Sequence, residues 1–366
     1  MTSYLLPPRL LRGFCFSGIC FFAWVALAGA ALAHAEAERV DSQWQLYSRL
    51  DLQAHSEPVP VMDMVEGWDG PFQSGRYAFG DVRLVTGAAW RQWFLERESR
   101  WHYDLRFSRG MSRYYYAQEQ NNELTANQSL SLDVRSIEAW GMRLGRRFEA
   151  SSGFGNLNIQ PALALYRVGH FQFGHLSGTA EAGESERASA QLRYFYDEDK
   201  ILEHDPFVPN GWGASLDLTL GWQYLHWQAR LQVQDLVNRW QWDDAAFTTA
   251  CINFNDPEQS ICSSSGTASG RSGQQQLVAR LLPTTSMSVS RADWQTEATL
   301  DWHGDFRRLG LTRFVLENRL GFSAYTSRQL GVEWRSEWLS FHWKADDLRF
   351  SYARDLDVGL GIDLKW

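Results

Sequence analysis

The chain has 366 residues, a formal net charge of −8, and 18 Trp, 13 Tyr and 21 Phe. The negative charge makes nucleic acid a poor partner, because binding to its phosphate backbone depends on an excess of Lys and Arg. No stretch after residue 35 approaches the roughly 20 consecutive apolar residues of a membrane helix, so the rest of the chain must use strands if it enters a bilayer.

Residues 1–35 are predicted to be a secretory signal peptide. Arg9 and Arg12 supply its positive start, residues 14–32 form an apolar stretch, and Ala-His-Ala at 33–35 fits a small-x-small cleavage site. Cleavage there leaves 33 basic and 43 acidic residues, a charge of −10. The mature chain is therefore expected to be exported and acidic.

Residues 36–75 are interpreted as a lead-in segment or as part of a first hairpin. Within them, residues 41–54 alternate apolar and polar side chains. This stretch could pair with a sheet, precede it as a lead-in, or lie inside a lumen, and the sequence leaves these options open.

From residue 76 to 366 the side chains alternate with a period of two, as in 101–106 (Trp-His-Tyr-Asp-Leu-Arg), 212–222 and 294–302. Side chains of a strand point to opposite faces with this period, so each strand has one apolar and one polar face. A soluble two-sheet sandwich shows the same alternation. Strands of nine residues or more, with aromatic rings near their ends, favour a transmembrane β-barrel.

The last strand carries the most specific pattern. Apolar residues occupy every second position from Leu356 to Leu364, and Trp366 follows in phase. This resembles the closing strand of bacterial outer-membrane β-barrel proteins, which ends in an aromatic residue read by the barrel-assembly machinery. The resemblance implies an all-β, antiparallel transmembrane barrel in the outer membrane of a Gram-negative bacterium. It also implies contact with outer-membrane lipid and lipopolysaccharide, and Trp366 as the assembly signal.

About 12 strands are expected, with 10 or 14 as alternatives, because single-chain barrels have even numbers. Pairing of 41–54 with part of 55–75 would give 14. The twelve spans are 76–94, 100–116, 126–147, 154–173, 187–199, 211–224, 227–242, 274–282, 292–303, 311–325, 328–344 and 347–366.

Counting back from a periplasmic C-terminus predicts which connections lie outside the cell. Residues 174–186 fall on the periplasmic side, where turns are usually short, which indicates an error of one hairpin in the count. The outer connections are predicted to be 95–99, 148–153, 200–210, 243–273, 304–310 and 345–346.

The longest predicted outer loop, 243–273, is rich in Ser and Gly and contains Cys251 and Cys262. These are the only cysteines after the signal peptide. The periplasm is oxidising, so the two are expected to form a disulfide within the loop.

If the apolar face meets lipid, the polar face lines the lumen. Acidic and basic residues occur on it in similar number, and charges of opposite sign pair across a narrow lumen without favouring anions or cations. The residues predicted to face the lumen are Asp104, Arg106, Asp133, Arg135, Arg193, Asp217, Arg230, Glu317, Arg319, Glu333 and Arg335.

The function expected from this pattern is a narrow channel or transporter for a small solute. A barrel of about 12 strands lies between small filled barrels and wide porins. A filled barrel with a structural or assembly role is the alternative that uses the same residues.

An outer-membrane hydrolase at the rim is the other alternative. His175 and Ser177 resemble the His-x-Ser pair of outer-membrane lipases, in which side chains two apart on a strand share a face. The third group would be Glu181, Glu184 or Glu186, and the predicted topology places the pair at the periplasmic end, away from the outer leaflet.

Asp301 and His303, together with Asp243 and Asp244, resemble the paired carboxylates and Asp–His couple of omptin-type proteases. The spacing is common by chance, and ordinary rim charges account for it. The sequence shows no metal-ligand cluster and no Gly-rich phosphate loop, so no cofactor is expected.

Overall fold

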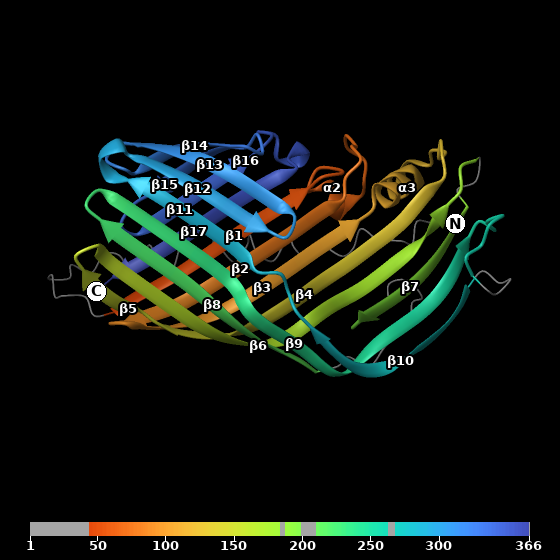
Figure 1. Cartoon of the computed structure of the whole chain (residues 1–366), viewed down its shortest axis with the longest axis horizontal. Coiled ribbons are helices and arrows are strands. Elements are labelled where there is room, and N and C mark those ends of the chain that lie inside the picture. The colour runs from red at the N-terminus through yellow and green to blue at the C-terminus, as the bar shows by residue number, and fades with distance from the viewer. Residues whose placement is uncertain (1–43, 184–186, 199–209, 263–267, 366) are drawn as a thin grey trace, which may run out of the picture.

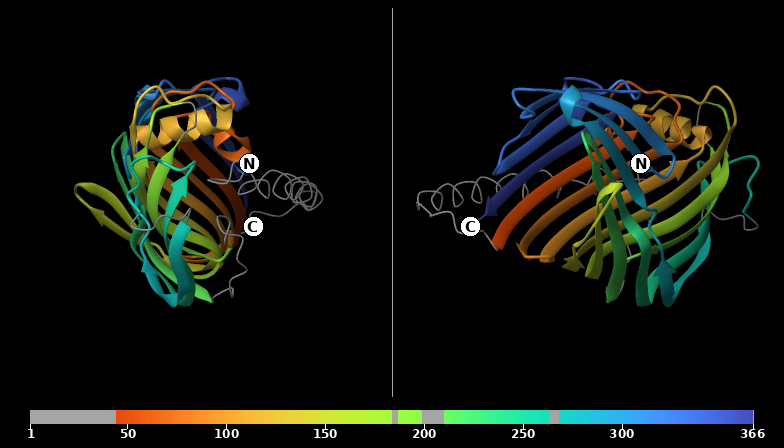
Figure 2. Two further views of the ribbon diagram at one scale, coloured as in Figure 1. Left: turned by 90° about the vertical axis from the view of Figure 1, so that its right-hand side faces the viewer. Right: turned by 60° about the vertical axis from the view of Figure 1, so that its left-hand side comes forward.

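The computed structural model describes residues 44–183, 187–198, 210–262 and 268–365. The predicted signal peptide and Trp366 lie outside these residues. Within them, the chain is an all-β antiparallel barrel in which 14 strands close a ring and three others lie outside it (Figures 1 and 2). No helix of the described residues is long and apolar enough to cross a membrane.

The ring strands are β1 (Trp44–Ser56), β2 (Tyr77–Trp90), β3 (Trp93–Phe107), β4 (Gln128–Arg146), β6 (Gly155–Ala180), β8 (Gly211–Tyr224), β9 (Trp227–Phe254), β11 (Thr284–Arg291), β12 (Thr296–His303), β13 (Phe306–Val315), β14 (Leu320–Tyr325), β15 (Leu330–Arg335), β16 (Leu339–Ala345) and β17 (Asp355–Lys365). The strands outside it are β5 (Phe148–Ser152), β7 (Ala188–Tyr196) and β10 (Ala268–Ala279). The helical segments are α2 (Asp63–Glu66), α3 (Arg109–Gln120), η2 (Ala292–Trp294) and η3 (Phe350–Tyr352).

β1 closes the ring. It pairs antiparallel with both β2 and β17, so that Leu50 lies opposite Leu84 on one side and Leu360 on the other. The described part of the alternating stretch 41–54 is therefore a strand of the barrel wall. Together, β1 and β2 form the first hairpin. The barrel is the 14-strand alternative, not the 12 strands expected first.

Two errors in strand boundaries explain the rest of the difference. The spans 311–325 and 328–344 were each expected to be one strand, but each contains two strands and a turn. The first turn uses left-handed backbone at Leu316, Glu317 and Asn318, with φ of 50°, 57° and 67°. Leu and Glu are not usual turn formers in that region of backbone conformation, so the residue types here did not predict a reversal. One difference lowers the strand count instead: β7 and β8 both pair antiparallel with β6 and together occupy a single position in the ring.

The two described ends of the chain lie together, since Gln45 is opposite Lys365. The turns at this end are short, for example 91–92, 153–154 and 225–226. Short turns mark the periplasmic end of an outer-membrane barrel, so the long connections at the opposite end are the outer ones. These include 57–76, 108–127 and 346–354.

This orientation corrects three predicted connections. Residues 174–186 do not form a periplasmic turn, because β6 continues to Ala180 and reverses at the outer end. Residues 95–99 lie within β3, and 148–153 belong to β5 and the periplasmic turn after it. The predicted loop 243–273 is also shorter than expected, because β9 runs to Phe254 and β10 begins at Ala268.

The outward face of the wall is an apolar belt bounded by aromatic rings. Leu163 and Leu165 are 54% and 59% exposed on β6, where their lumen-side neighbours are buried. On β8, Trp212 and Trp222 stand ten residues apart. Ten residues tilted by about 45° rise roughly 23 Å, close to the height of about 25 Å typical of the lipid-facing band. The wall therefore fits a bilayer.

The outer end carries a small apolar core around α3, which lies at the end of the barrel away from the C-terminus in Figure 1. Ser108 caps this helix by accepting a hydrogen bond from the N–H of Met111 at 3.0 Å. Met111 and Tyr114 then pack with Leu176 of β6 and Ala190 of β7. The helix thereby fixes the outer ends of these long strands.

Candidate functional site

A charged network crosses the inside of the ring between β3 and β9, which are separated by three strands. Arg100 Nη2 lies 2.6 Å from Asp235 Oδ2, and Arg83 Nη2 lies 3.3 Å from the same oxygen. Both arginines also hold Asp81, at 2.9 and 3.3 Å. Because these pairs join walls that do not touch, their side chains lie in the lumen.

The backbone of β9 is shaped to deliver Asp235. This residue has φ of 56°, and the β8–β9 ladder shifts register beside it. Its N–H donates to Asp217 Oδ1 at 2.8 Å, and Ser215 Oγ donates to its carboxylate at 2.8 Å. Asp217 in turn lies 3.3 Å from Arg143 Nε. A β-bulge thus turns one carboxylate into the lumen and links the network to β4 and β8.

Two histidines extend the network toward the outer end. His102 Nδ1 lies 2.8 Å from Asp81 Oδ2, and His303 Nε2 lies 3.5 Å from Asp104 Oδ2. The two imidazole rings meet edge to face with centroids 5.5 Å apart. His303 belongs to β12, so this contact also crosses the lumen.

A second network lies against β12–β17. Asp357 accepts hydrogen bonds from Arg308, from His342 Nε2 at 2.7 Å and from Lys344 Nζ at 3.2 Å. Arg308 also donates to Asp301 at 2.7 Å. One carboxylate therefore neutralises cationic groups from β13 and β16.

Several polar atoms in the first network have no hydrogen-bond partner among the described residues. They include both carboxylate oxygens of Glu98, Nε and Nη1 of Arg100, and Nε2 of His102, and all three residues are fully buried in the protein. Leaving such groups without water or another partner costs about 1–3 kcal/mol each. Because all three side chains are fully buried, neither water nor a solute reaches these atoms in this structure, and the lumen is closed at this level.

Nine of the eleven residues predicted to face the lumen lie on strands in the polar phase. Asp104 and Asp217 belong to the first network, where Arg106 Nε lies 3.6 Å from Asp104. Toward the periplasmic end, Arg335 pairs with Glu297 and Glu333 at 3.4 and 3.2 Å. The others on polar faces are Asp133, Arg135, Arg193 and Arg230.

Glu317 and Arg319 do not face the lumen from a strand. They lie exposed in the turn between β13 and β14 at the periplasmic end. The prediction was wrong because the strand expected over 311–325 is two strands, so the polar phase does not run through the turn.

The residues that build the lumen networks were mostly missed. Arg83 and Arg100 stand in the polar phase of spans that were predicted as strands, so alternation could have found them, whereas Glu98 falls in the predicted outer connection 95–99. Asp235 could not be found in this way, because the bulge moves it out of the alternating phase.

The candidate protease site is not assembled. His303 is buried inside the lumen, where it also contacts Thr284 Oγ1 at 2.8 Å, and Asp301 is held by Arg308. Asp243 instead accepts a hydrogen bond from Gln241, whose neighbours on β8 and β10 are outward residues. Asp243 and the imidazole of His303 therefore lie on opposite sides of the wall.

The candidate lipase pair lies at the outer end, not at the periplasmic end. His175 and Ser177 line a surface pocket there, together with Arg193 and Arg271. His175 Nδ1 is 2.9 Å from Asp133 Oδ1 on the neighbouring strand. The third polar group is thus Asp133. Of the glutamates proposed for that role, Glu181 instead accepts backbone hydrogen bonds from residues 258 and 259, and the other two lie outside the described residues.

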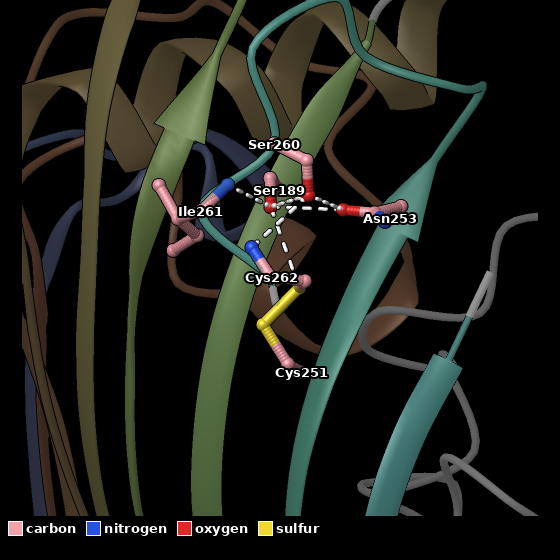
Figure 3. Close-up of a disulfide and its surroundings, with 6 residues drawn as sticks. All are labelled: Ser189, Cys251, Asn253, Ser260, Ile261 and Cys262. Atoms are coloured by element: carbon pink, nitrogen blue, oxygen red, sulfur yellow. Dashed lines mark hydrogen bonds between the residues drawn. A yellow bond between two sulfur atoms is a disulfide. The ribbon is translucent and has the colours of Figure 1, made fainter. Parts of the chain in front are cut away.

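Cys251 and Cys262 form the predicted disulfide. Cys251 stands on β9, and the bond draws the following loop onto β7 (Figure 3). There, buried Ser189 accepts a hydrogen bond from the N–H of Ile261 at 3.0 Å and donates to Asn253 at 2.9 Å. The disulfide therefore fixes the outer loop against the wall beside the pocket.

No protein-family model and no curated protein matches the sequence. Among solved structures, the toluene transporter TbuX of Ralstonia pickettii is 11% identical, with 88% of this chain and 89% of that chain covered and a TM-score of 0.27. The siderophore receptor PirA of Pseudomonas aeruginosa is 7% identical, with 90% and 82% covered and a TM-score of 0.19. The CymD monoaromatic hydrocarbon channel is 8% identical, with 89% of each chain covered and a TM-score of 0.22. Likeness at this level carries no conclusion about function.

The architecture itself identifies the class of protein. The ring closes without an edge strand, its outward face is an apolar belt between aromatic girdles, and its charged residues meet inside. The chain is an outer-membrane β-barrel protein.

Proposed function

We propose that this barrel is a narrow channel for a small polar solute, with the Arg100–Asp235 contact as its constriction. The observation that carries the proposal is the set of polar atoms on Glu98, Arg100 and His102 that have no hydrogen bond among the described residues, with Arg83 Nη1 3.6 Å from Glu98 Oε1. A barrel that is filled for stability alone would satisfy these atoms with its own side chains. Donors and acceptors left open along a lumen are instead the groups that replace a solute's hydration shell.

The experiment is conductance in planar bilayers. Purified full-length mature chain is expected to give small, discrete conductance steps. A correctly assembled, heat-modifiable barrel that gives no steps, and that also fails to admit small sugars in liposome swelling, would favour the filled structural barrel.

A second function has one specific observation in its favour. Asp133, His175 and Ser177 together supply an acid, an imidazole and a hydroxyl on adjacent strands at the outer end, and His175 and Ser177 line a pocket there. In ester hydrolysis, Ser177 Oγ would attack the acyl carbon while His175 takes its proton, and the alcohol would leave with that proton. Water would then release the acyl group.

The test of this activity is a pair of serine variants. If the site is catalytic, Ser177→Ala should abolish release of fatty acid from phospholipid or of p-nitrophenol from short acyl esters. Ser151→Ala, in an exposed periplasmic hairpin, is the matched control and should keep full activity. Absence of hydrolysis in the wild type, or equal activity in both variants, would remove this candidate.

A further inference from the structure

Two arginines on the outward face stand at the level of an aromatic girdle. Arg167 of β6 lies directly opposite Trp140 of β4 on one side and Trp212 of β8 on the other. Both tryptophans are exposed outward, at 42% and 45%. On the next strand, Arg239 of β9 lies opposite Ala214, two residues along β8 from Trp212. These four residues, Trp140, Arg167, Trp212 and Arg239, are called the Trp–Arg row.

Three members of the row lie directly opposite one another, and Arg239 lies two residues closer to the periplasmic end. Trp140, Arg167 and Trp212 are 12 residues from the strand ends at Ser152, Gly155 and Tyr224, whereas Arg239 is opposite Ala214, ten residues from Tyr224. Ten to twelve residues tilted by about 45° rise roughly 23–28 Å, close to the height of about 25 Å of the lipid-facing band. The row therefore lies where the outer leaflet changes from hydrocarbon to headgroup.

The two cations lack carboxylate partners on this face. Within the described residues neither arginine forms an ion pair, and Arg239 donates only to the neutral amide of Gln241, at 2.9 Å. The outward carboxylates lie farther toward the outer end, Glu138 two residues beyond Trp140 and Asp243 four residues beyond Arg239. An outward arginine at the bilayer midplane costs about 2–4 kcal/mol, and the cost falls to about 0–1 kcal/mol near the interface. Two arginines at this level are thus tolerated, and an anion would stabilise them.

The spacing suits a phosphorylated headgroup. The strands β6 and β9 are separated by β8, and Arg239 is offset by two residues along β9, so the two arginine backbones stand about 12 Å apart. Guanidinium groups bind phosphate through paired hydrogen bonds, and the flanking indoles lie at the depth that aromatic rings prefer in a membrane interface. The headgroup at this depth of the outer leaflet is that of lipopolysaccharide, whose lipid anchor carries phosphates on a sugar core.

We propose that the Trp–Arg row binds the phosphorylated sugar headgroup of one lipopolysaccharide molecule on the outer wall of the barrel. The site lies outside the lumen and does not depend on what passes through it. It would hold the lipid beside the wall at β4–β9, where the strands bend toward the outer pocket.

The test compares the two arginines of the Trp–Arg row with a third outward arginine on the same barrel. The double variant Arg167→Gln, Arg239→Gln is expected to bind purified bisphosphorylated lipid A about tenfold more weakly than the wild type, measured as lipid retained per barrel in native mass spectrometry. The control is Arg313→Gln, which removes an exposed outward arginine whose guanidinium bonds the carbonyl of Trp294 at the periplasmic girdle. This control should bind lipid A as the wild type does.

Three results would overturn the proposal. One is unchanged lipid A retention by the double variant while it remains a heat-modifiable barrel. Another is an equal loss in the Arg313→Gln control, which would mean a general attraction to cations. The third is equal retention of phosphatidylglycerol and lipid A by the wild type, which would make any anionic lipid sufficient.

Discussion

Replacing Arg100 with alanine is expected to raise single-channel conductance several-fold and to make the channel prefer cations. Arg100 is fully buried and spans the lumen to Asp235 at 2.6 Å, so its removal takes a long side chain out of the constriction. The carboxylates it leaves behind, with Glu98 among them, form a negatively charged lining of the kind that selects cations. The measurement is conductance and reversal potential under a salt gradient in planar bilayers.

The variant should still fold, because each carboxylate keeps another partner. Asp235 retains Arg83 at 3.3 Å, and Asp81 retains Arg83 and His102 at 2.9 and 2.8 Å. The control is Arg349→Ala, which removes an exposed arginine of an outer connection whose carboxylate partner is Asp347. Wild-type conductance and selectivity in Arg100→Ala would show that ions do not pass this contact.

The class of fold was predictable because a membrane barrel imposes one simple rule on every strand. Period-two alternation identified the lipid face correctly on strands such as β8, and the same rule placed most of the predicted charges on the polar face. The disulfide was predictable from chemistry alone, since two cysteines in an oxidising compartment have few alternatives.

The number of strands was harder to predict, because a strand of six or seven residues contains too few alternating positions to show where it begins and ends. β14 and β15 have six residues each, and the turns beside them contain no Gly or Pro. The directions of the connections before residue 211 failed for a different reason. The spans 187–199 and 211–224 were counted as two antiparallel strands, whereas β7 and β8 run in the same direction and share one ring position. This extra reversal inverts the assignment of the segments before it, which is how His175 was first assigned to the periplasmic end, whereas the two missed turns cancel each other.

The site could not be predicted because its partners meet across the lumen. Arg83 and Asp235 are separated by 152 residues in sequence and stand on strands that are not neighbours. Alternation gives the face of a side chain, but not its height relative to the opposite wall. That height depends on the shear of the barrel, which is fixed only when all 14 strands pair.

Replacing Asp357 with alanine is expected to destabilise the barrel by about 3–5 kcal/mol, the cost of removing one partner from a buried ion pair. Asp357 accepts hydrogen bonds from Arg308, His342 and Lys344, and Arg308 is 2% exposed. Without this carboxylate, Lys344 has no carboxylate partner among the described residues. Arg308 then keeps one carboxylate partner among them, Asp301. The measurement is the free energy of unfolding in urea, followed by Trp fluorescence with the protein in lipid vesicles.

The matched control is Asp347→Ala, which removes an exposed carboxylate whose partner is Arg349 on the same outer connection. A solvent-accessible ion pair of this kind contributes little to the free energy of unfolding, so the control should unfold at the same urea concentration as the wild type. The double variant Asp357→Ala, Lys344→Met should recover part of the loss, because it removes the charge left without a partner and keeps its aliphatic stem. If Asp357→Ala unfolds with the wild type, or if the second substitution adds to the loss, then Asp357 is not the counterion that holds the β13–β17 side of the lumen together.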